Sequence, residues 1–342
     1  MTADQSAKLT ASRPTRRDDL DVLKVFACLL ITNSHCRAIY PLYFLAIGGG
    51  HGNGLFFIVS GFLLGNIRLP FGAWMKKRVL RILPVTLLFA AFSVFVTDGL
   101  SYYSSLGIWN ACATIINKYW FAAAIMLFYP IYYLVFSSGN RRTAWTALFV
   151  YAVGYALIYA FLVDKTVFSV EPEGFAPFKV YFYFGVMLAG GLLRRMTDAN
   201  KTADSPKRLR AVSLLCAAAA FALWTVVYAL ITLKGMGLSV QFLIHVGVMA
   251  FSVAMFVFAG TFTDFRLPDS RAGRVLRIAA ASTLEIYLVQ VTIQPYMSAM
   301  PFPLNWAAFF ISAFAGGMLL HQAVDALSAR RIRAAYGRKG SM

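Results

Sequence analysis

The sequence is poor in acidic side chains, in histidine and in cysteine. Only 14 of its 342 residues are Asp or Glu, against 32 Lys and Arg, and charged residues together make up 13%. Soluble domains carry about 25% charged residues, so this scarcity excludes an ordinary soluble domain. The four cysteines stand apart in apolar stretches without CxxC spacing. This arrangement argues against a zinc site or a disulfide framework and favours packed thiols.

Apolar runs are what the chain has instead. Hydrophobic residues make up 59% of the sequence, and apolar runs recur from residue 22 to residue 328. The first twenty residues are polar and basic, so we expect no cleavable signal peptide. The pattern predicts an all-α fold, a polytopic helical bundle in a lipid bilayer with about ten transmembrane helices. The expected spans are 22–43, 53–67, 79–97, 119–136, 143–163, 177–194, 211–233, 240–260, 279–298 and 304–326.

The basic residues predict the orientation of these spans. Nearly all of them fall on alternate connecting segments, together with the two ends of the chain. The positive-inside rule therefore places both termini in the cytoplasm. The net charge of +18 follows from this topology, and a nucleic-acid partner does not follow from it. Lys24 lies inside the first span, and the segments expected outside keep only Arg37, Lys118, Lys165, Lys179 and Lys234.

No domain boundary is visible within the apolar region. We expect a cytoplasmic N-terminal tail over residues 1–21, one transmembrane domain over 22–328 and a basic cytoplasmic C-terminal tail over 329–342. The longest polar interruption, residues 194–210, predicts a cytoplasmic loop rather than a second folded unit.

Lys24 and His35 are the first candidate site residues. Eleven positions apart in one predicted helix, they fall on nearly the same face, about 16 Å apart along the axis. A lysine near the cytoplasmic edge can snorkel to the headgroups. A histidine at membrane depth, with Asn33 and Ser34 beside it, is costly and indicates a functional site, although a hydrogen-bonded structural role is the alternative.

The segment GGGHGNGLFFIVSGFLLG (48–65) is the second candidate region. Its glycines permit tight turns and close approach of helices, and Ser60 with Gly61 interrupts the apolar run. Packing alone also explains these glycines. His51 is expected near the outer edge, where water can solvate it.

The third region is WMKKRVLRILP (74–84), on the side predicted to be cytoplasmic. Arg78 and Arg81 are i,i+3 neighbours on one helix face. Such a pair can clamp phosphates with forked hydrogen bonds, but the same charges also serve as a topology signal.

These segments together resemble the acyltransferase-3 family of integral membrane acyltransferases. Asp21 stands in the family's opening motif, and Lys24 with His35 matches its basic residue, ten residues, histidine pattern. Arg78 and Arg81 match its R-x-x-R motif. YWFAAAIMLFYPIYY (119–133) and STLEIYLVQ (282–290) resemble two later helices of the family, so the resemblance spans most of the chain.

The resemblance implies a protein of the bacterial inner membrane that transfers an acyl group, usually acetyl, from cytoplasmic acyl-coenzyme A to an envelope glycan. Arg78, Arg81 and Lys24 would hold the donor phosphates, and His35 would act as the base or carry the acyl group. Glu285 and Ser60 are possible supporting residues, with Asn33 and Ser34. No metal and no tightly bound cofactor are expected, because acyl-coenzyme A is a co-substrate.

Three departures from the family pattern stand out. Many relatives have histidine where this chain has Gln290, so that position supplies no acid or base here. Lysine replaces the commoner arginine at position 24, which weakens bidentate phosphate recognition there. No fused extracytoplasmic domain follows the tenth span, from which we expect a stand-alone transferase.

Two other classes of function remain open. Ten spans with intramembrane polar residues are also typical of secondary transporters, although the two halves show no internal repeat. A non-catalytic membrane protein of the same fold is the other alternative. The acceptor is open as well: O-antigen, exopolysaccharide, periplasmic glucan and lipid-linked sugar all fit, and the acyl group could be succinyl instead of acetyl.

Overall fold

The computed structural model describes residues 16–172, 174–199 and 206–337, so residues 1–15 and 338–342 of the two predicted tails lie outside it. The described part is helical and contains no strand. The helices are α2 (Asp18–Ser34), α3 (Gly49–Leu64), α4 (Phe71–Phe92), α5 (Leu100–Lys118), α6 (Trp120–Phe136), α7 (Arg141–Phe161), α8 (Pro177–Ala199), α9 (Pro206–Lys234), α10 (Phe242–Gly260), α11 (Arg271–Ala281), α12 (Thr283–Ile293) and α13 (Leu304–Gly337).

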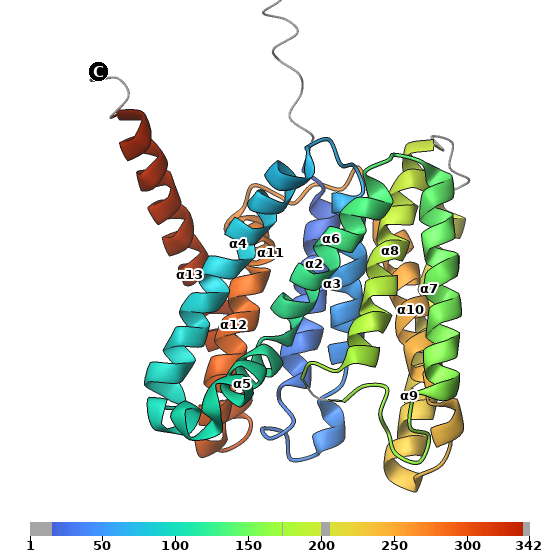
Figure 1. The fold of residues 1–342 in the computed structure, drawn as a ribbon, viewed down its shortest axis with the longest axis horizontal. Helices are drawn as coiled ribbons and strands as arrows, with labels where there is room; N and C mark the ends of the chain where they lie inside the picture. Colours follow the sequence, from blue (N-terminus) through green and yellow to red (C-terminus); the bar gives the residue numbers. More distant parts are fainter. Residues whose placement is uncertain (1–15, 173, 200–205, 338–342) are drawn as a thin grey trace, which may run out of the picture.

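Most helices stand side by side in one bundle, while α5 lies across its lower end and the upper part of α13 leans away from it in Figure 1. Within the described residues, six helices are long and apolar enough to cross a membrane, or eight if each of two bent pairs forms one span. The bent pairs are α5 with α6, at 90°, and α11 with the helix that follows it, at 76°. Each predicted span overlaps a helix, but the number ten remains a prediction, since α2 has only 17 residues.

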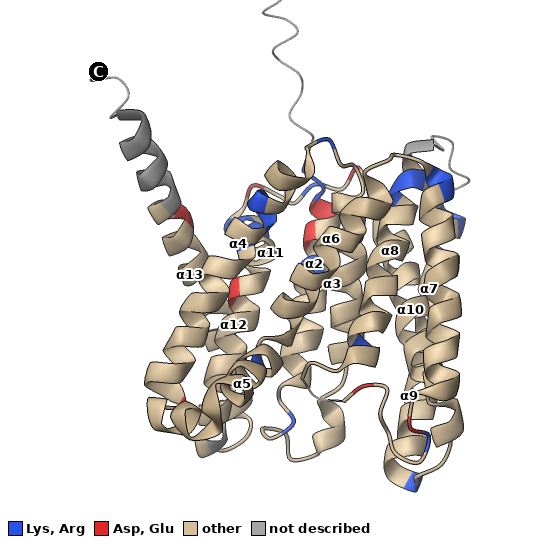
Figure 2. Ribbon diagram, in the orientation of Figure 1, with Lys and Arg blue, Asp and Glu red and all other residues tan. Residues whose placement is uncertain are grey.

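The charges divide the bundle into two ends. Lys and Arg gather at the upper end in Figure 2, where α2 begins and α8 ends, and few lie at the lower end. We call the upper end the basic end. This segregation supports the orientation inferred from the sequence, in which the basic end faces the cytoplasm.

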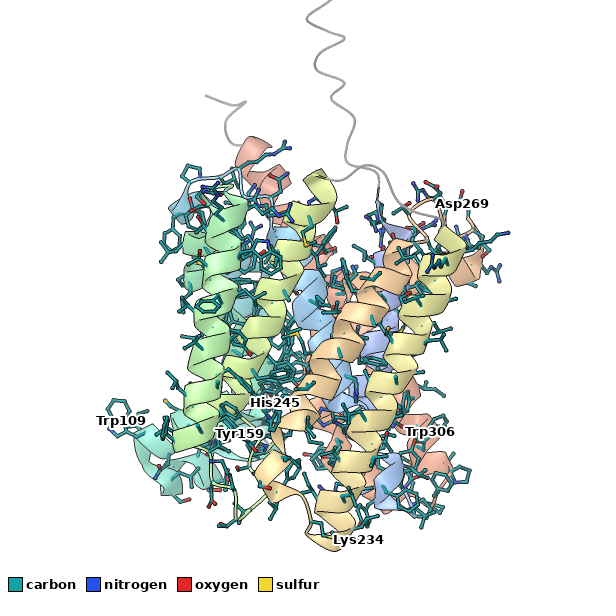
Figure 3. The ribbon with its side chains drawn as sticks, turned by 90° about the vertical axis from the view of Figure 1, so that its right-hand side faces the viewer. Trp109, Tyr159, Lys234, His245, Asp269 and Trp306 are labelled. Atoms are coloured by element: carbon teal, nitrogen blue, oxygen red, sulfur yellow. The ribbon has the colours of Figure 1, made fainter. Side chains whose placement is uncertain are left out.

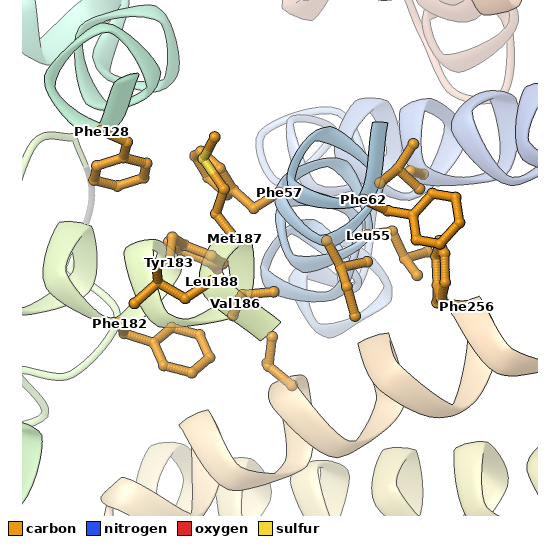
Figure 4. Packing of buried hydrophobic residues seen from close by; sticks show 14 of the residues in the cluster. Leu55, Phe57, Phe62, Phe128, Phe182, Tyr183, Val186, Met187, Leu188 and Phe256 are labelled. Atoms are coloured by element: carbon orange, nitrogen blue, oxygen red, sulfur yellow. The ribbon is translucent and has the colours of Figure 1, made fainter. Parts of the chain in front are cut away.

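The core is built where α3 crosses α8. Leu55, Phe57 and Phe62 of α3 pack with Tyr183 and Met187 of α8 in a continuous apolar cluster (Figure 4). Burial of aromatic and branched side chains on both helices makes this contact a large apolar contribution to stability.

Glycine brings the two helices close together. A Cβ atom at Gly61 would overlap the carbonyl oxygen of Met187, and one at Gly190 would overlap that of Ile58. The Ser60–Gly61 pair therefore does not break α3, as α3 continues to Leu64. Gly61 marks the point of closest approach, which is the packing role that small residues have between membrane helices.

Carboxylates fasten the start of α2. Asp18, Asp19 and Asp21 lie buried in its first turn, next to the positive end of the helix dipole. The Asp18 Oδ2 atom accepts the backbone N–H of Leu267 at 2.8 Å and lies 3.5 Å from Nη2 of Arg277. These bonds tie α2 to α11 and its preceding loop. The helix begins at Asp18, before the predicted first span, and ends at Ser34, well before residue 43.

The orientation can be tested by cysteine labelling. Lys234 and Asp269 lie at opposite ends of the bundle (Figure 3). In a variant without the four native cysteines, we expect Lys234→Cys to react with a membrane-impermeant maleimide in intact cells. Asp269→Cys should react only after permeabilisation, because its end carries the positive charges. The opposite labelling pattern would invert the proposed orientation.

The helix crossing predicts a stability effect at Gly61. Gly61→Ala should lower the free energy of unfolding by ~1–3 kcal/mol, because the added methyl forces α3 away from α8. Thermal unfolding in detergent micelles measures the change. Gly72→Ala is the matched control, since a Cβ atom at Gly72 meets nothing within 4 Å. Equal melting temperatures for the parent and Gly61→Ala would contradict the proposed close approach.

Candidate functional site

Two cavities adjoin in the bundle. One, of about 380 Å³, is lined by Lys24, Ser60 and Arg81, and we call it the Lys24 cavity. The other, of about 430 Å³, is lined by His35, and we call it the His35 cavity. Ile31 and Tyr287 line both. The two cavities therefore meet at this pair of side chains. Ile31 lies one turn of α2 before His35, and Tyr287 belongs to α12.

The Lys24 side chain is held at the wall of its cavity by a local ion pair. Its Nζ atom lies 2.6 Å from Oδ1 of Asp21, and its side chain is 21% exposed. Asp21 also accepts a hydrogen bond from Arg16 at 2.5 Å. The ammonium group thus remains accessible from the cavity while a buried carboxylate balances its charge.

Arg81 approaches the same cavity from α4. Its guanidinium forks onto Glu285, with Nη1 to Oε1 at 2.6 Å and Nη2 to Oε2 at 3.3 Å. The Glu285 side chain is fully buried, whereas that of Arg81 is 42% exposed. Nδ1 of His321 lies 3.2 Å from the same carboxylate. Glu285 therefore fixes the guanidinium from the protein side and leaves part of it open to a ligand.

Arg78 lies elsewhere. Its Nη1 atom donates to the Trp74 carbonyl at 3.3 Å, and its guanidinium carbon lies 4.5 Å from the centre of the Trp74 ring. Arg78 is not part of the lining of the Lys24 cavity. The structure thus places Lys24 and Arg81 on the lining of this cavity, and Arg78 outside it.

His35 stands at the C-terminal cap of α2. Its backbone N–H bonds to the carbonyls of Ile31 and Thr32, at 3.3 and 3.2 Å, and its ring lines the His35 cavity. Among the described residues, no carboxylate hydrogen-bonds this ring. Glu285, a possible supporting residue because it is a carboxylate within an apolar span, contacts Arg81.

The neighbours of His35 shape the cavity. Asn33 donates through Nδ2 to the carbonyls of Leu45 and Ile47, at 2.9 and 3.0 Å, and accepts from the Tyr40 hydroxyl at 2.6 Å. Asn33 therefore positions the loop after α2. Ser34 lines the cavity and donates to the Ile31 carbonyl at 2.7 Å.

Gly48 and Gly49 bring α3 against α2 beside His35. Gly48 has φ = 101°, a left-handed conformation that side chains rarely adopt, and it ends the loop directly before α3. A Cβ atom at Gly49 would press on the Ser34 side chain. The first residues of α3 can line the His35 cavity only because these positions carry no side chain.

Thr32 and Gln290 connect α2 to α12 beneath His35. The Thr32 hydroxyl lies 2.7 Å from Oε1 of Gln290 and 2.9 Å from the Cys28 carbonyl. Nε2 of Gln290 is buried without a hydrogen-bond partner among the described residues. Gln290 therefore acts here as a link between helices.

The other three histidines are structural in different ways. The expectation that water solvates His51 is wrong, because this side chain is fully buried among the rings of Phe221, Trp224 and Phe251. The His245 ring stacks on Phe182 with the ring centres 3.9 Å apart. Its Nδ1 atom lies 2.9 Å from the Tyr155 hydroxyl. His321 belongs to the Glu285 cluster.

Within the described residues no group of His, Cys, Asp and Glu has the arrangement of a metal site.

Sequence reasoning missed one wall of the His35 cavity. Glu171, from the loop between α7 and α8, lines it together with Lys179 of α8 and Trp120 of α6. Oε1 of Glu171 accepts from the Tyr183 hydroxyl at 2.9 Å. Burial raises the pKa of the Glu171 carboxyl, while Lys179 and the Tyr183 hydroxyl act in the opposite direction. The only available signal was the presence of Glu171 and Lys179 close together in sequence, in the outer loop and at the start of the helix that follows it.

One of the comparisons with known proteins identifies the family. A family model, Acyl_transf_3, described as an acyltransferase domain, matches residues 17–322. No curated protein and no solved structure matches the chain. The match covers nearly the whole chain and confirms the resemblance carried by the Lys24–His35 and Arg78–Arg81 motifs. The protein therefore belongs to the acyltransferase-3 family.

Proposed function

We propose that this protein is a membrane acyltransferase of the bacterial inner membrane. It moves an acyl group, acetyl in the first instance, from cytoplasmic acyl-coenzyme A to a hydroxyl of an envelope polysaccharide or lipid-linked sugar. One observation carries the proposal: in a chain of this family, a cavity with two cations adjoins a cavity with the motif histidine.

The Lys24 cavity suits the phosphate end of the donor. Lys24 and Arg81 present positive charge, and each is already balanced by a carboxylate, Asp21 or Glu285. An incoming phosphate gains charged hydrogen bonds to groups that the protein has oriented in advance. The apolar lining, which includes Phe56, suits the uncharged arm of coenzyme A.

The thioester then reaches His35 past Ile31 and Tyr287. His35 takes the proton of an acceptor hydroxyl, the hydroxyl oxygen attacks the acyl carbon, and coenzyme A leaves as the thiolate, which receives a proton. In the alternative route the imidazole attacks the thioester and expels the coenzyme A thiolate, and the acceptor oxygen then displaces the imidazole from the acyl-histidine while the hydroxyl proton passes to that imidazole. Both routes require the acyl group to reach His35 and an acceptor to lie in the His35 cavity.

The histidine assignment predicts loss of chemistry without loss of the protein. His35→Ala should abolish acyl transfer, since no other histidine lines either cavity. Its amount in the membrane and its melting temperature should remain near those of the parent. Incorporation of radiolabel from acyl-coenzyme A into envelope glycans measures the activity. Near-parental transfer by the folded variant would remove His35 from the mechanism.

The two arginines should respond differently to a conservative change. Arg81→Lys keeps the charge but loses the forked geometry, so the KM for acyl-coenzyme A should rise about tenfold. Arg78→Lys should leave this KM unchanged, because Arg78 does not line the Lys24 cavity.

Direct binding of acyl-coenzyme A to the purified variants also separates an enzyme from a transporter that does not use this donor. Equal affinities for the Arg81 variant, the Arg78 variant and the parent would show that the motif only determines membrane orientation.

A further inference from the structure

The Lys24 cavity contains hydroxyl groups that its two cations do not explain. Four of the side chains that line it carry a hydroxyl: Ser60, Tyr129, Thr283 and Tyr287. The Tyr287 hydroxyl donates to the Lys118 carbonyl at 3.3 Å. Among the described residues, the hydroxyls of the other three have no hydrogen-bond partner. Polar groups inside a protein are normally bonded to the protein, so these hydroxyls are available to a ligand.

Ser60 departs from the behaviour of other hydroxyls in this bundle. A serine or threonine within a helix can donate to the carbonyl four residues earlier. Thr32, Ser252 and Thr292 do so here, at 2.9, 2.7 and 2.9 Å. Ser60 makes no such bond to the Phe56 carbonyl, although it lies well within α3. Its hydroxyl can therefore bond to a group in the cavity.

Tyr129 contrasts with a tyrosine one turn further along α6. The Tyr133 hydroxyl donates to the Leu69 carbonyl at 3.2 Å, outside the cavity. Tyr129 is only 5% exposed, and no described residue hydrogen-bonds its hydroxyl. Its ring packs edge-on against the buried Trp74 ring, with the ring centres 5.6 Å apart. This packing fixes the direction of a hydroxyl whose neighbourhood is the cavity.

Ser60 and Tyr129 lie at different depths of the cavity. At the end where the two cavities meet, the rings of Phe56 and Phe121 are 6.0 Å apart, and the Phe121 ring lies 5.8 Å from that of Tyr287. Both α3 and α6 run away from this end, since their first residues line the other cavity. Ser60 lies four residues after Phe56 and Tyr129 eight residues after Phe121, which places them about 6 and about 12 Å along their helices.

Two hydroxyls at different depths suit a long ligand with separated polar groups. The pantetheine arm of coenzyme A carries two amides, one after the other from the thioester, with short apolar links between them. An amide carbonyl accepts a hydrogen bond from a hydroxyl, and an amide N–H can donate to a serine oxygen. An amide without a partner in an apolar cavity would lose the hydrogen bonds that it makes in water. Ser60 and Tyr129 can replace these bonds, while Lys24 and Arg81 remain for the phosphates.

We propose that Ser60 and Tyr129 bind the two amides of the pantetheine arm, the amide nearer the thioester at Ser60 and the other at Tyr129. The protein therefore recognises the arm in addition to the phosphates, and a thioester of pantetheine without the nucleotide is also a donor. This inference rests on the proposed function, because it concerns the donor of that reaction. It adds Tyr129, which the sequence did not single out, to the donor site.

A truncated donor separates the arm from the phosphates. S-acetylpantetheine keeps the thioester and both amides but has no phosphate. We expect Tyr129→Phe and Ser60→Ala each to raise the KM about threefold to tenfold for acetyl-coenzyme A and for S-acetylpantetheine alike, because one hydrogen bond is lost with either donor. Arg81→Lys should raise the KM for acetyl-coenzyme A only. Incorporation of labelled acetyl groups into the envelope glycans of isolated membranes measures the transfer.

Tyr133→Phe is the matched control. It removes a hydroxyl from the same helix, but Tyr133 does not line the cavity, so its KM for both donors should be parental. Parental KM values for S-acetylpantetheine in both Tyr129→Phe and Ser60→Ala would overturn the proposal. A rise confined to acetyl-coenzyme A would overturn it as well, since the hydroxyls would then bind a part of the donor that S-acetylpantetheine lacks.

A binding measurement keeps the inference testable apart from the reaction. S-acetylpantetheine should raise the melting temperature of the parent, of Arg81→Lys and of Tyr133→Phe by similar amounts, and that of Tyr129→Phe and Ser60→Ala by less. If this pattern holds but no acyl group is transferred, the proposed function fails while the arm site stands. If the parent transfers acyl groups from acetyl-coenzyme A but neither binds nor uses S-acetylpantetheine, the arm site fails alone.

Discussion

A charge inside an apolar bundle must have a partner, and this constraint organises the site. Lys24 is held by Asp21 and Arg81 by Glu285, each at 2.6 Å. Removing one partner from such a pair leaves an uncompensated charge, which costs several kcal/mol when the group is buried. Where each charged side chain can lie therefore depends on where the helix that carries its partner lies. The Arg81–Glu285 fork fastens α4 to α12, while the Asp21–Lys24 pair sits at the fastened start of α2.

The same pairs allow the cavity to receive an anion. A cation without a partner would destabilise the protein when no ligand is bound. A cation whose N–H donors were all bonded to its partner could not hydrogen-bond a ligand. Arg81 meets both requirements, because Glu285 is fully buried and the guanidinium is 42% exposed. The carboxylate takes one edge of the guanidinium, and other N–H donors remain for a ligand. In the proposed reaction the donor phosphates would take up this capacity.

Much of the fold could be predicted from composition and periodicity. The span expected at 143–163 corresponds to α7, Arg141–Phe161, within two residues at each end. The motif residues Lys24, His35 and Arg81 were also singled out from the sequence, and all three line cavities. Breaks in helices were harder to predict. The span expected at 279–298 begins in the last residues of α11, and α11 is bent by 76° from the helix that follows it.

Pairings across the bundle could not be predicted. His51 was expected in water and is buried among three rings, because the register of α3 against α9 and α10 decides its surroundings. Arg78 and Arg81 are equivalent in the sequence motif, yet a rotation along one helix turns Arg78 onto Trp74 and Arg81 onto Glu285. Glu171 drew no attention because its partner Tyr183 and the other cavity residues come from separate helices.

By itself, the sequence determined the class of the protein and its family. Long apolar runs exclude a soluble domain, since each would expose too much apolar surface to water. In a bilayer, unpaired backbone groups are so costly that these runs must be helical. The tertiary structure decided which charges meet, where α2 ends and which residues enclose the two cavities. These depend on contacts between helices that are distant in the sequence, and neither hydropathy nor local spacing specifies such contacts.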